Sequence, residues 1–224
     1  MSKKRYTSAT NEKPAIYSKK VYAKNEAQTL YSKLIKENTI TFGTGPAGTG
    51  KTYIAVALAI DAFINGEVDK ILLTRPIVAV EDIGYLPGDM HEKINPYIMP
   101  LFDALESQLG ITKAGELIAS RKIEVLPLAY MRGRTLDRCF IIADEMQNTT
   151  PEQMKMLLTR IGYESKMVIT GDLAQSDLKI SKNGLQWATE RLKGKIPDIA
   201  LLEFTRGEIV RNPIIGEMLK YLEN

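Results

Sequence analysis

The chain has 224 residues, of which 44% are hydrophobic and 25% charged, with one Cys, one His and a formal net charge of +3. This composition excludes disordered, collagen-like and coiled-coil chains, and the length fits one α/β domain, or at most two small ones. One Cys excludes an internal disulfide and a Cys-based metal site, and one His argues against a His-ligated metal enzyme. The apolar run at 54–60 is too short to cross a bilayer, and no signal peptide precedes it. We therefore expect a soluble cytoplasmic protein with no membrane partner.

The positive charge is concentrated at the start of the chain. Residues 1–24 hold seven cations and one anion, whereas the remainder holds 23 cations and 26 anions. We therefore divide the chain into a basic N-terminal arm, residues 1–24, and a single domain, residues 25–224. Such an arm can attract nucleic-acid phosphate, and the alternative is a solvated, poorly ordered terminus.

Helical patterns alternate with short apolar runs that are typical of buried parallel strands. Predicted helices cover residues 26–37, 51–65, 96–109, 114–120, 151–161, 183–192 and 213–222. Predicted strands cover residues 39–44, 70–74, 123–126, 139–143, 166–170 and 199–204. This alternation predicts an α/β fold, a three-layer domain with a mostly parallel central sheet.

The first predicted strand leads into a glycine-rich loop that matches the pattern G-x4-G-K-[ST]. The loop consists of Gly45, Pro46, Ala47, Gly48, Thr49, Gly50, Lys51 and Thr52. In such a loop the backbone N–H groups and the N-terminus of the following helix cradle phosphates. Lys51 would contact the β- and γ-phosphates and the Thr52 hydroxyl would bind Mg²⁺. The alternative is a tight turn without a ligand.

The predicted strand 139–143 ends in two acids. Asp144 would hold Mg²⁺ through its water shell, and Glu145 would polarise the attacking water. A solvated strand end is the alternative. Cys139 is interpreted as a small core residue rather than a reactive thiol.

The predicted strand 166–170 also ends in polar residues, which suggests a sensor of the γ-phosphate. Thr170, Asp172 and Gln175 are the candidates, and a strand followed by a plain turn is the alternative. Upstream, the amide of Gln28 could bond both edges of adenine, or it could be an exposed helix residue. Arg75 follows another strand and could contact nucleotide, nucleic-acid backbone or a neighbouring subunit.

Further arginines have candidate roles. The segment 130–135 combines a tyrosine with Arg132 and Arg134 beside a glycine, which suits contact with a single strand or describes a charged surface loop. Three others could neutralise transition-state charge, in the same chain or from an adjacent subunit. They are Arg160, Arg206 and Arg211.

Several of these segments together resemble the PhoH family of P-loop ATPases. The resemblance spans about residues 22–222 and rests on the motifs 45–52, 73–76, 85–89, 144–150, 153–156 and 170–172. It implies a RecA-like domain similar to the nucleotide-binding half of superfamily 1 helicases, with ATPase activity and, in some members, RNA unwinding. Gln175 and Gln28 match the sensor and adenine-reading glutamines of that superfamily. The family's terminal Asp-Val-Val-Arg-His-Pro reads Glu-Ile-Val-Arg-Asn-Pro here, so Arg211 is kept and the His is not.

We therefore expect a Mg²⁺-dependent ATPase coupled to RNA or single-stranded nucleic acid. Superfamily 1 motors hold ATP between two domains, so one domain implies a homo-oligomer, such as a hexameric ring, in which a neighbour completes the site. A slow ATP-gated binding switch is the alternative, and a small-molecule kinase is a third reading. A compact chain of this kind also suits a phage-encoded copy, which would act in the host cytoplasm.

Overall fold

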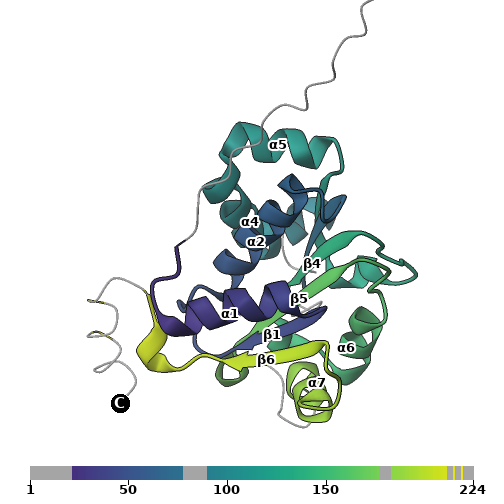
Figure 1. The fold of residues 1–224 in the computed structure, drawn as a ribbon. Helices are drawn as coiled ribbons and strands as arrows, with labels where there is room; N and C mark the ends of the chain where they lie inside the picture. Colours follow the sequence, from purple (N-terminus) through teal and green to yellow (C-terminus); the bar gives the residue numbers. More distant parts are fainter. Residues whose placement is uncertain (1–21, 78–89, 177–182, 211–213, 215–217, 219–224) are drawn as a thin grey trace, which may run out of the picture.

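The computed structural model describes residues 22–77, 90–176, 183–210, 214 and 218, which form a layered α/β domain (Figure 1). Its helices are α1 (Glu26–Glu37), α2 (Lys51–Ile64), α4 (Met90–Leu109), α5 (Ile111–Ala119), α6 (Pro151–Leu158) and α7 (Gly184–Leu192). Its strands are β1 (Ile40–Thr44), β2 (Lys70–Arg75), β3 (Ile123–Pro127), β4 (Cys139–Ala143), β5 (Lys166–Gly171) and β6 (Ile199–Glu203). Within the described part, no helix is both long and apolar enough to cross a membrane.

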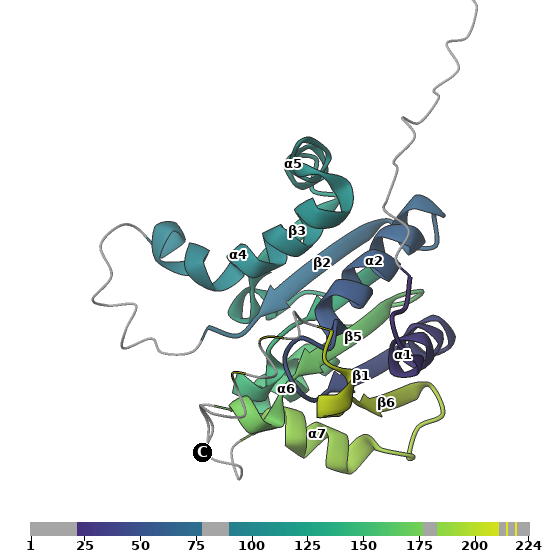
Figure 2. The same cartoon turned by 90° about the vertical axis from the view of Figure 1, so that its left-hand side faces the viewer.

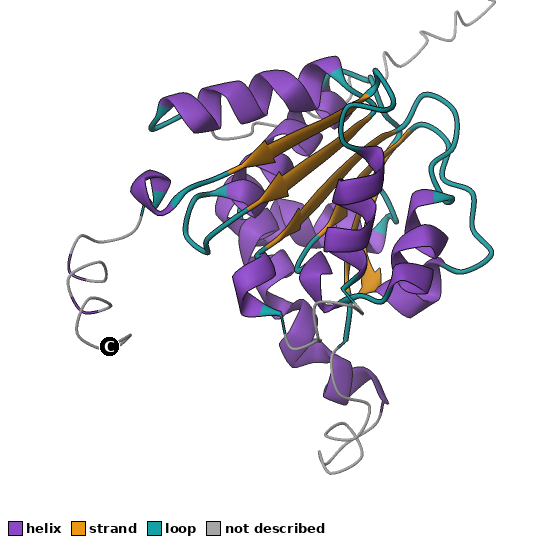
Figure 3. Ribbon diagram, turned by 90° about the horizontal axis from the view of Figure 1, so that it is seen from below, coloured by secondary structure: helices purple, strands orange, loops and turns teal. Residues whose placement is uncertain are grey.

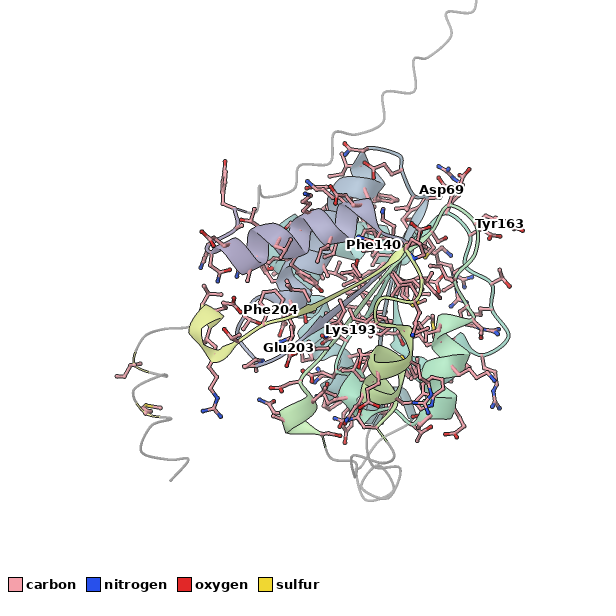
Figure 4. The ribbon with its side chains drawn as sticks, turned by 60° about the horizontal axis from the view of Figure 1, so that its bottom comes forward. Asp69, Phe140, Tyr163, Lys193, Glu203 and Phe204 are labelled. Atoms are coloured by element: carbon pink, nitrogen blue, oxygen red, sulfur yellow. The ribbon has the colours of Figure 1, made fainter. Side chains whose placement is uncertain are left out.

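The six strands form one sheet in the order β3-β2-β4-β5-β1-β6, and every neighbouring pair is parallel. All carboxyl ends therefore meet at one edge, as the arrowheads in Figure 3 show. In Figure 4, Glu203 and Phe204 lie at this edge, and Asp69 and Tyr163 lie at the opposite one. Strand β5 separates β1 from β4, so the side chains that follow β1, β5 and β4 stand in a row.

Helices cover both faces of the sheet (Figures 2 and 3). One face packs against α1, α2, α4 and α5, and the other packs against α6 and α7. Side chains of β4 alternate between the two layers, since Phe140 and Ile142 belong to the first and Ile141 and Ala143 to the second. The predicted three-layer α/β fold is confirmed, and the sheet is parallel throughout.

All six predicted strands form, but two helices begin earlier than predicted. Helix α4 begins at Met90 rather than at Pro96, and α5 begins at Ile111. Proline favours the first helical turn, so the sequence suggests a start at Pro96, whereas the helix continues through Pro96 and Pro100. The predicted helix 213–222 lies largely outside the described residues.

Helix α1 is fixed beside the end of β1 by one aromatic contact. Tyr31 lies over Gly43, where an added Cβ would come 2.5 Å from the phenol oxygen, and its ring meets Phe204 edge-on at 5.3 Å. Burial, with a smaller contribution from Asp144, raises the pKa of the Tyr31 hydroxyl well above its ordinary value. Tyr31 therefore stays neutral and acts as part of the core.

An ion-pair cluster joins the amino-terminal parts of β2 and β3. Glu124 accepts from Lys70 Nζ at 2.6 Å and pairs with Arg134 Nη2 at 2.8 Å. Burial alone would raise the pKa of Glu124, but these hydrogen bonds hold it below its ordinary value of 4.5. A carboxylate with a lowered pKa stabilises the fold above its unfolded-state pKa, and this stabilisation is lost as the pH falls through the folded-state value.

We expect Glu124→Gln to lower the free energy of unfolding at neutral pH by about 1 to 2 kcal/mol. Below about pH 4.5 the difference in stability from the wild type should narrow, because Glu124 of the unfolded wild-type chain then binds a proton that the folded chain binds less readily. Urea unfolding of both chains at neutral pH and below about pH 4.5 measures this difference in the free energy of unfolding. Glu116→Gln breaks the more exposed pair with Lys113 and should change stability far less. An equal loss of stability in both variants would contradict a stabilising role for the Glu124 ion-pair cluster.

Candidate nucleotide-binding site

A cleft of about 240 Å³ opens at the carboxyl edge of the sheet. Its lining comes from the glycine-rich loop and the start of α2, from the acids after β4, and from the end of β5 with the short helix η3 (Leu173–Gln175). The structure thus brings together three segments that the sequence proposes for one nucleotide site.

The glycine-rich loop needs glycine at Gly45 and Gly50, which have φ of +117° and +86°. A Cβ at Gly45 would lie 2.2 Å from the Phe204 carbonyl oxygen. Lys51 is buried, and its Nζ donates to the carbonyls of Gly45 at 2.6 Å and Pro46 at 2.7 Å. The ammonium group therefore folds across the loop, and an incoming phosphate would compete for its donors.

We expect Gly45→Ala to destabilise the chain by about 1 to 3 kcal/mol and to weaken nucleotide binding, because the new methyl group meets backbone atoms at a strained φ. Thermal unfolding and a nucleotide titration measure the two effects. Gly115→Ala is the matched control, since a Cβ at Gly115 in α5 meets nothing within 4 Å. That variant should be as stable as the wild type or more so. Tolerance of alanine at Gly45 would contradict the packing argument.

Asp144 is the buried centre of the cleft. Its Oδ1 accepts from Thr52 Oγ1 at 2.6 Å and from Thr170 Oγ1 at 2.5 Å. Among the described residues no group of three or more His, Cys, Asp or Glu could enclose a metal ion. A cation beside Thr52 and Asp144 would take its other ligands from water and phosphate, which is the coordination that Mg²⁺ prefers. The donor set fits Mg²⁺ that arrives with a nucleotide.

Glu145 stands at the mouth of the cleft in a left-handed backbone conformation, with φ of +55° and a side chain that is 35% exposed. A non-glycine residue in this region is strained, and such strain clusters at functional sites. Gln147 Nε2 donates to Glu145 Oε2 at 2.5 Å, and Arg75 Nη2 lies 3.4 Å from Glu145 Oε1. Two side chains therefore hold the carboxylate.

The proposed sensor residues have different environments. Thr170 bonds Asp144, and Asp172 is buried and accepts from the Ala174 N–H at 3.0 Å. Gln175 is exposed on η3 and lines the cleft. All three candidates line the cleft, and Gln175 is the exposed one.

Gln28 is not an exposed helix residue, since only 4% of it is exposed. Its Nε2 donates to the Thr49 carbonyl at 2.9 Å, and its Oε1 accepts from the Lys24 N–H at 2.8 Å. Gln28 thus links α1 to the glycine-rich loop. Adenine recognition by Gln28 stays a prediction.

Two residues of the site escape sequence reasoning. Tyr53 lines the cleft with 43% of its surface exposed, although α2 is apolar nearly all round and suggests burial there. Gln147 is buried in the short helix η2 (Met146–Asn148) and contacts Glu145. Gln147 lies within the motif 144–150 that carries the family resemblance, but the sequence does not indicate its contacts with Glu145 and Asp172.

The arginines fall into separate groups. Arg134 pairs with Glu124, and Arg160 donates to the Arg134 and Met156 carbonyls, so both bind the chain's own groups outside the cleft lining. Arg132 and Arg206 are exposed. Arg211 lies outside the described residues, as do residues 1–21 of the arm.

The buried position of Cys139 agrees with a core role. Burial raises the pKa of its thiol to about 12, which keeps it protonated at neutral pH. Met154 and Leu157 of α6 likewise lie in the core.

A parallel sheet with a phosphate loop after β1 and an acid pair after β4 defines this domain as a P-loop NTPase domain. A family model described as "PhoH-like protein" matches residues 20–223. The chain belongs to the PhoH family.

Curated relatives agree with this assignment. The chain is 50% identical over 204 residues to a PhoH-like protein of Bacillus subtilis, covering 90% of this chain and 64% of that protein. It is 41% identical over 203 residues to Protein PhoH of Escherichia coli, covering 89% and 57%. The chain therefore spans about three fifths of the length of these relatives.

Solved structures of helicases align with most of the chain at low identity. The UvsW helicase of bacteriophage T4 gives a TM-score of 0.49 at 13% identity, covering 86% of this chain and 64% of that one. The Pif1 helicase of Candida albicans gives 0.43 at 16% identity, covering 89% and 44%.

Proposed function

We propose that this chain hydrolyses ATP in a Mg²⁺-dependent reaction coupled to the binding or unwinding of RNA or another single strand. The observation that carries the proposal is the Thr52–Asp144 hydrogen bond, with Lys51 and Glu145 lining the same cleft. Lys51 would contact the phosphates, and Thr52 and Asp144 would hold Mg²⁺. When bound, Mg²⁺ would offset the negative charge of the phosphates. Glu145 would accept a proton from the attacking water, whose oxygen bonds to the terminal phosphorus while the bond from this phosphorus to the bridging oxygen breaks and ADP leaves.

The cleft has the character of half a site, which supports a homo-oligomer. Its volume of about 240 Å³ is below the roughly 300 Å³ at which ligand pockets usually begin. Among the described lining residues Lys51 is the one cation, against Asp144, Glu145 and Asp172. Transition-state charge on the terminal phosphate calls for a further cation, and an arginine from a neighbouring copy in a ring, such as a hexamer, would supply it. Arg206 and Arg211 are the candidates.

Oligomer formation can be tested by the phosphate-release rate per subunit as a function of protein concentration, with light scattering on the same samples. A shared site predicts a rate that rises with concentration and levels off as the assembly fills. A constant rate from a monomer would exclude the shared site.

Residues that end or follow β2 and its edge neighbour β3 support a contact with a single strand. Arg75 ends β2, and the neighbouring β3 leads to Tyr130, which is 54% exposed, and to Arg132. An aromatic surface and nearby cations suit stacked bases and backbone phosphates. Because Arg75 also contacts Glu145, a nucleic-acid phosphate that attracts Arg75 would change the surroundings of the proposed general base. This contact supports coupling between polymer and hydrolysis.

The coupling can be tested by fluorescence anisotropy of a labelled single-stranded RNA and DNA, titrated without nucleotide, with ADP and with a non-hydrolysable ATP analogue. We expect the nucleotide state to change polymer affinity about 5- to 150-fold, and affinity to fall with salt as phosphate contacts require. Equal affinity in all three states would contradict coupling.

The same contacts favour one alternative, a slow ATP-gated switch. In this structure Glu145 pairs with Arg75. A general base held in an ion pair accepts a proton less readily, which suits slow hydrolysis, in which the bound nucleotide mainly sets partner affinity. Glu145→Gln separates this alternative from a motor, as described in the Discussion.

A further inference from the structure

Gln147 joins Glu145, the proposed general base, to the proposed sensor segment that begins at Asp172. Its Nε2 donates to Glu145 Oε2 at 2.5 Å, and its Oε1 accepts from the Asp172 N–H at 3.1 Å. Only 1% of the residue is exposed. A single buried amide thus spans the segment after β4 and the segment after β5.

The orientation of this amide is fixed by chemistry. A carboxylate oxygen can only accept a hydrogen bond and a backbone N–H can only donate one. Turning the amide by 180° would place its oxygen against Glu145 and its NH₂ group against the Asp172 N–H, so both bonds would be lost. One orientation alone satisfies both neighbours.

The backbone around Gln147 is also held in place. Its carbonyl accepts from Asn183 Nδ2 at 2.9 Å and from Ser176 Oγ at 3.0 Å. A Cβ at Gly171 would lie 2.7 Å from Gln147 Oε1, so glycine at this position gives the amide its space. Both ends of the η3 segment, Asp172 and Ser176, therefore bond Gln147.

The two partners of Glu145 differ in how firmly they are held. The Gln147 amide is buried and both its ends are bonded, whereas the Arg75 side chain is 23% exposed and donates to the Tyr97 carbonyl at 3.5 Å, the limit for a hydrogen bond. Gln147 is thus the fixed partner of Glu145.

We propose that Gln147 is a positioning residue for ATP hydrolysis. This inference rests on the proposed ATPase activity. Its NH₂ group sets the direction of the Glu145 carboxylate towards the attacking water. Its oxygen ties that direction to the Asp172–Gln175 segment, so a movement of the sensor on phosphate release is passed to Glu145.

The test is Gln147→Met, which keeps the length and unbranched shape of the side chain and removes both hydrogen bonds. We expect kcat for ATP hydrolysis to fall about 10- to 100-fold, because the Glu145 carboxylate no longer points at the attacking water. The Kd for ATP should change less than about threefold. Gln147→Glu keeps an acceptor for the Asp172 N–H and replaces the donor to Glu145 by a like charge, so it should lose kcat as well.

The matched control is Gln186→Met in α7, which removes a Gln-to-Glu hydrogen bond of 2.8 Å, to Glu190, outside the cleft lining. It should leave kcat unchanged. Thermal unfolding of every variant identifies a loss of fold. If Gln147→Met keeps the wild-type kcat, or loses kcat, ATP affinity and thermal stability together while Gln147→Glu stays active, the positioning role is overturned. A wild-type chain that binds ATP but never hydrolyses it would instead remove the proposed function, and this inference with it.

Discussion

Glu145→Gln should slow phosphate release from ATP about 100- to 10,000-fold, the usual contribution of a positioned general base. A neutral amide of nearly the same shape cannot take the proton of the attacking water. Because Lys51, Thr52 and Asp144 remain, ATP should bind as in the wild type. Single-turnover phosphate release and a nucleotide titration measure the two quantities separately.

The control for this variant is Glu190→Gln, which makes the same chemical change on an exposed side chain of α7. It should leave both quantities unaltered. Hydrolysis by Glu145→Gln at the wild-type rate would remove Glu145 from the mechanism. The variant also separates the two functions: a motor should lose unwinding and keep ATP binding, whereas a switch should stay in its partner-bound state.

Lys51→Ala should weaken ATP binding about 10- to 150-fold, which is the loss of a charged hydrogen bond of about 1.5 to 3 kcal/mol. Hydrolysis should fall further, since charge builds up on the phosphate oxygens in the transition state. Lys51 is the one cation among the described residues that line the cleft, so no other described lining residue can replace its charge. A titration with a fluorescent ATP analogue measures the affinity.

The matched control is Lys155→Ala, because Lys155 is an exposed lysine of α6 on the other face of the sheet. Its affinity for ATP should equal that of the wild type. Thermal unfolding of Lys51→Ala is needed beside it, because Lys51 also donates to the Gly45 and Pro46 carbonyls. Unchanged affinity in a folded Lys51→Ala variant would show that phosphate binds elsewhere.

The four inner strands could be predicted because each is a short, largely buried apolar run, as is typical of parallel strands. The edge strands β3 and β6 are only partly buried and give a weaker signal. Helix ends were harder to place. Pro96 suggests a helix start in sequence, but α4 already runs from Met90. The order of the strands, with β5 between β1 and β4, is set by tertiary packing rather than by local pattern.

The site residues likewise divide into those that the local sequence reveals and those that only the fold brings together. The glycine-rich loop and the pair Asp144 and Glu145 are contiguous in sequence, so their chemistry can be proposed from the residues alone. Gln147 becomes visible only when β4 and β5 lie side by side, because its second partner, Asp172, is 25 residues away. The partners of Arg134 and Arg160 likewise depend on the fold.

The most direct test of the central claim is phosphate release from ATP and Mg²⁺ by the purified chain, with and without single-stranded RNA and DNA at several salt concentrations. Glu145→Gln is the blank in each condition. We predict release that depends on Mg²⁺, rises when a single strand is added at low salt and returns towards the basal rate as salt displaces the polymer. A rate that is the same with and without both polymers, or the same in Glu145→Gln, would contradict ATP hydrolysis at this site coupled to nucleic acid.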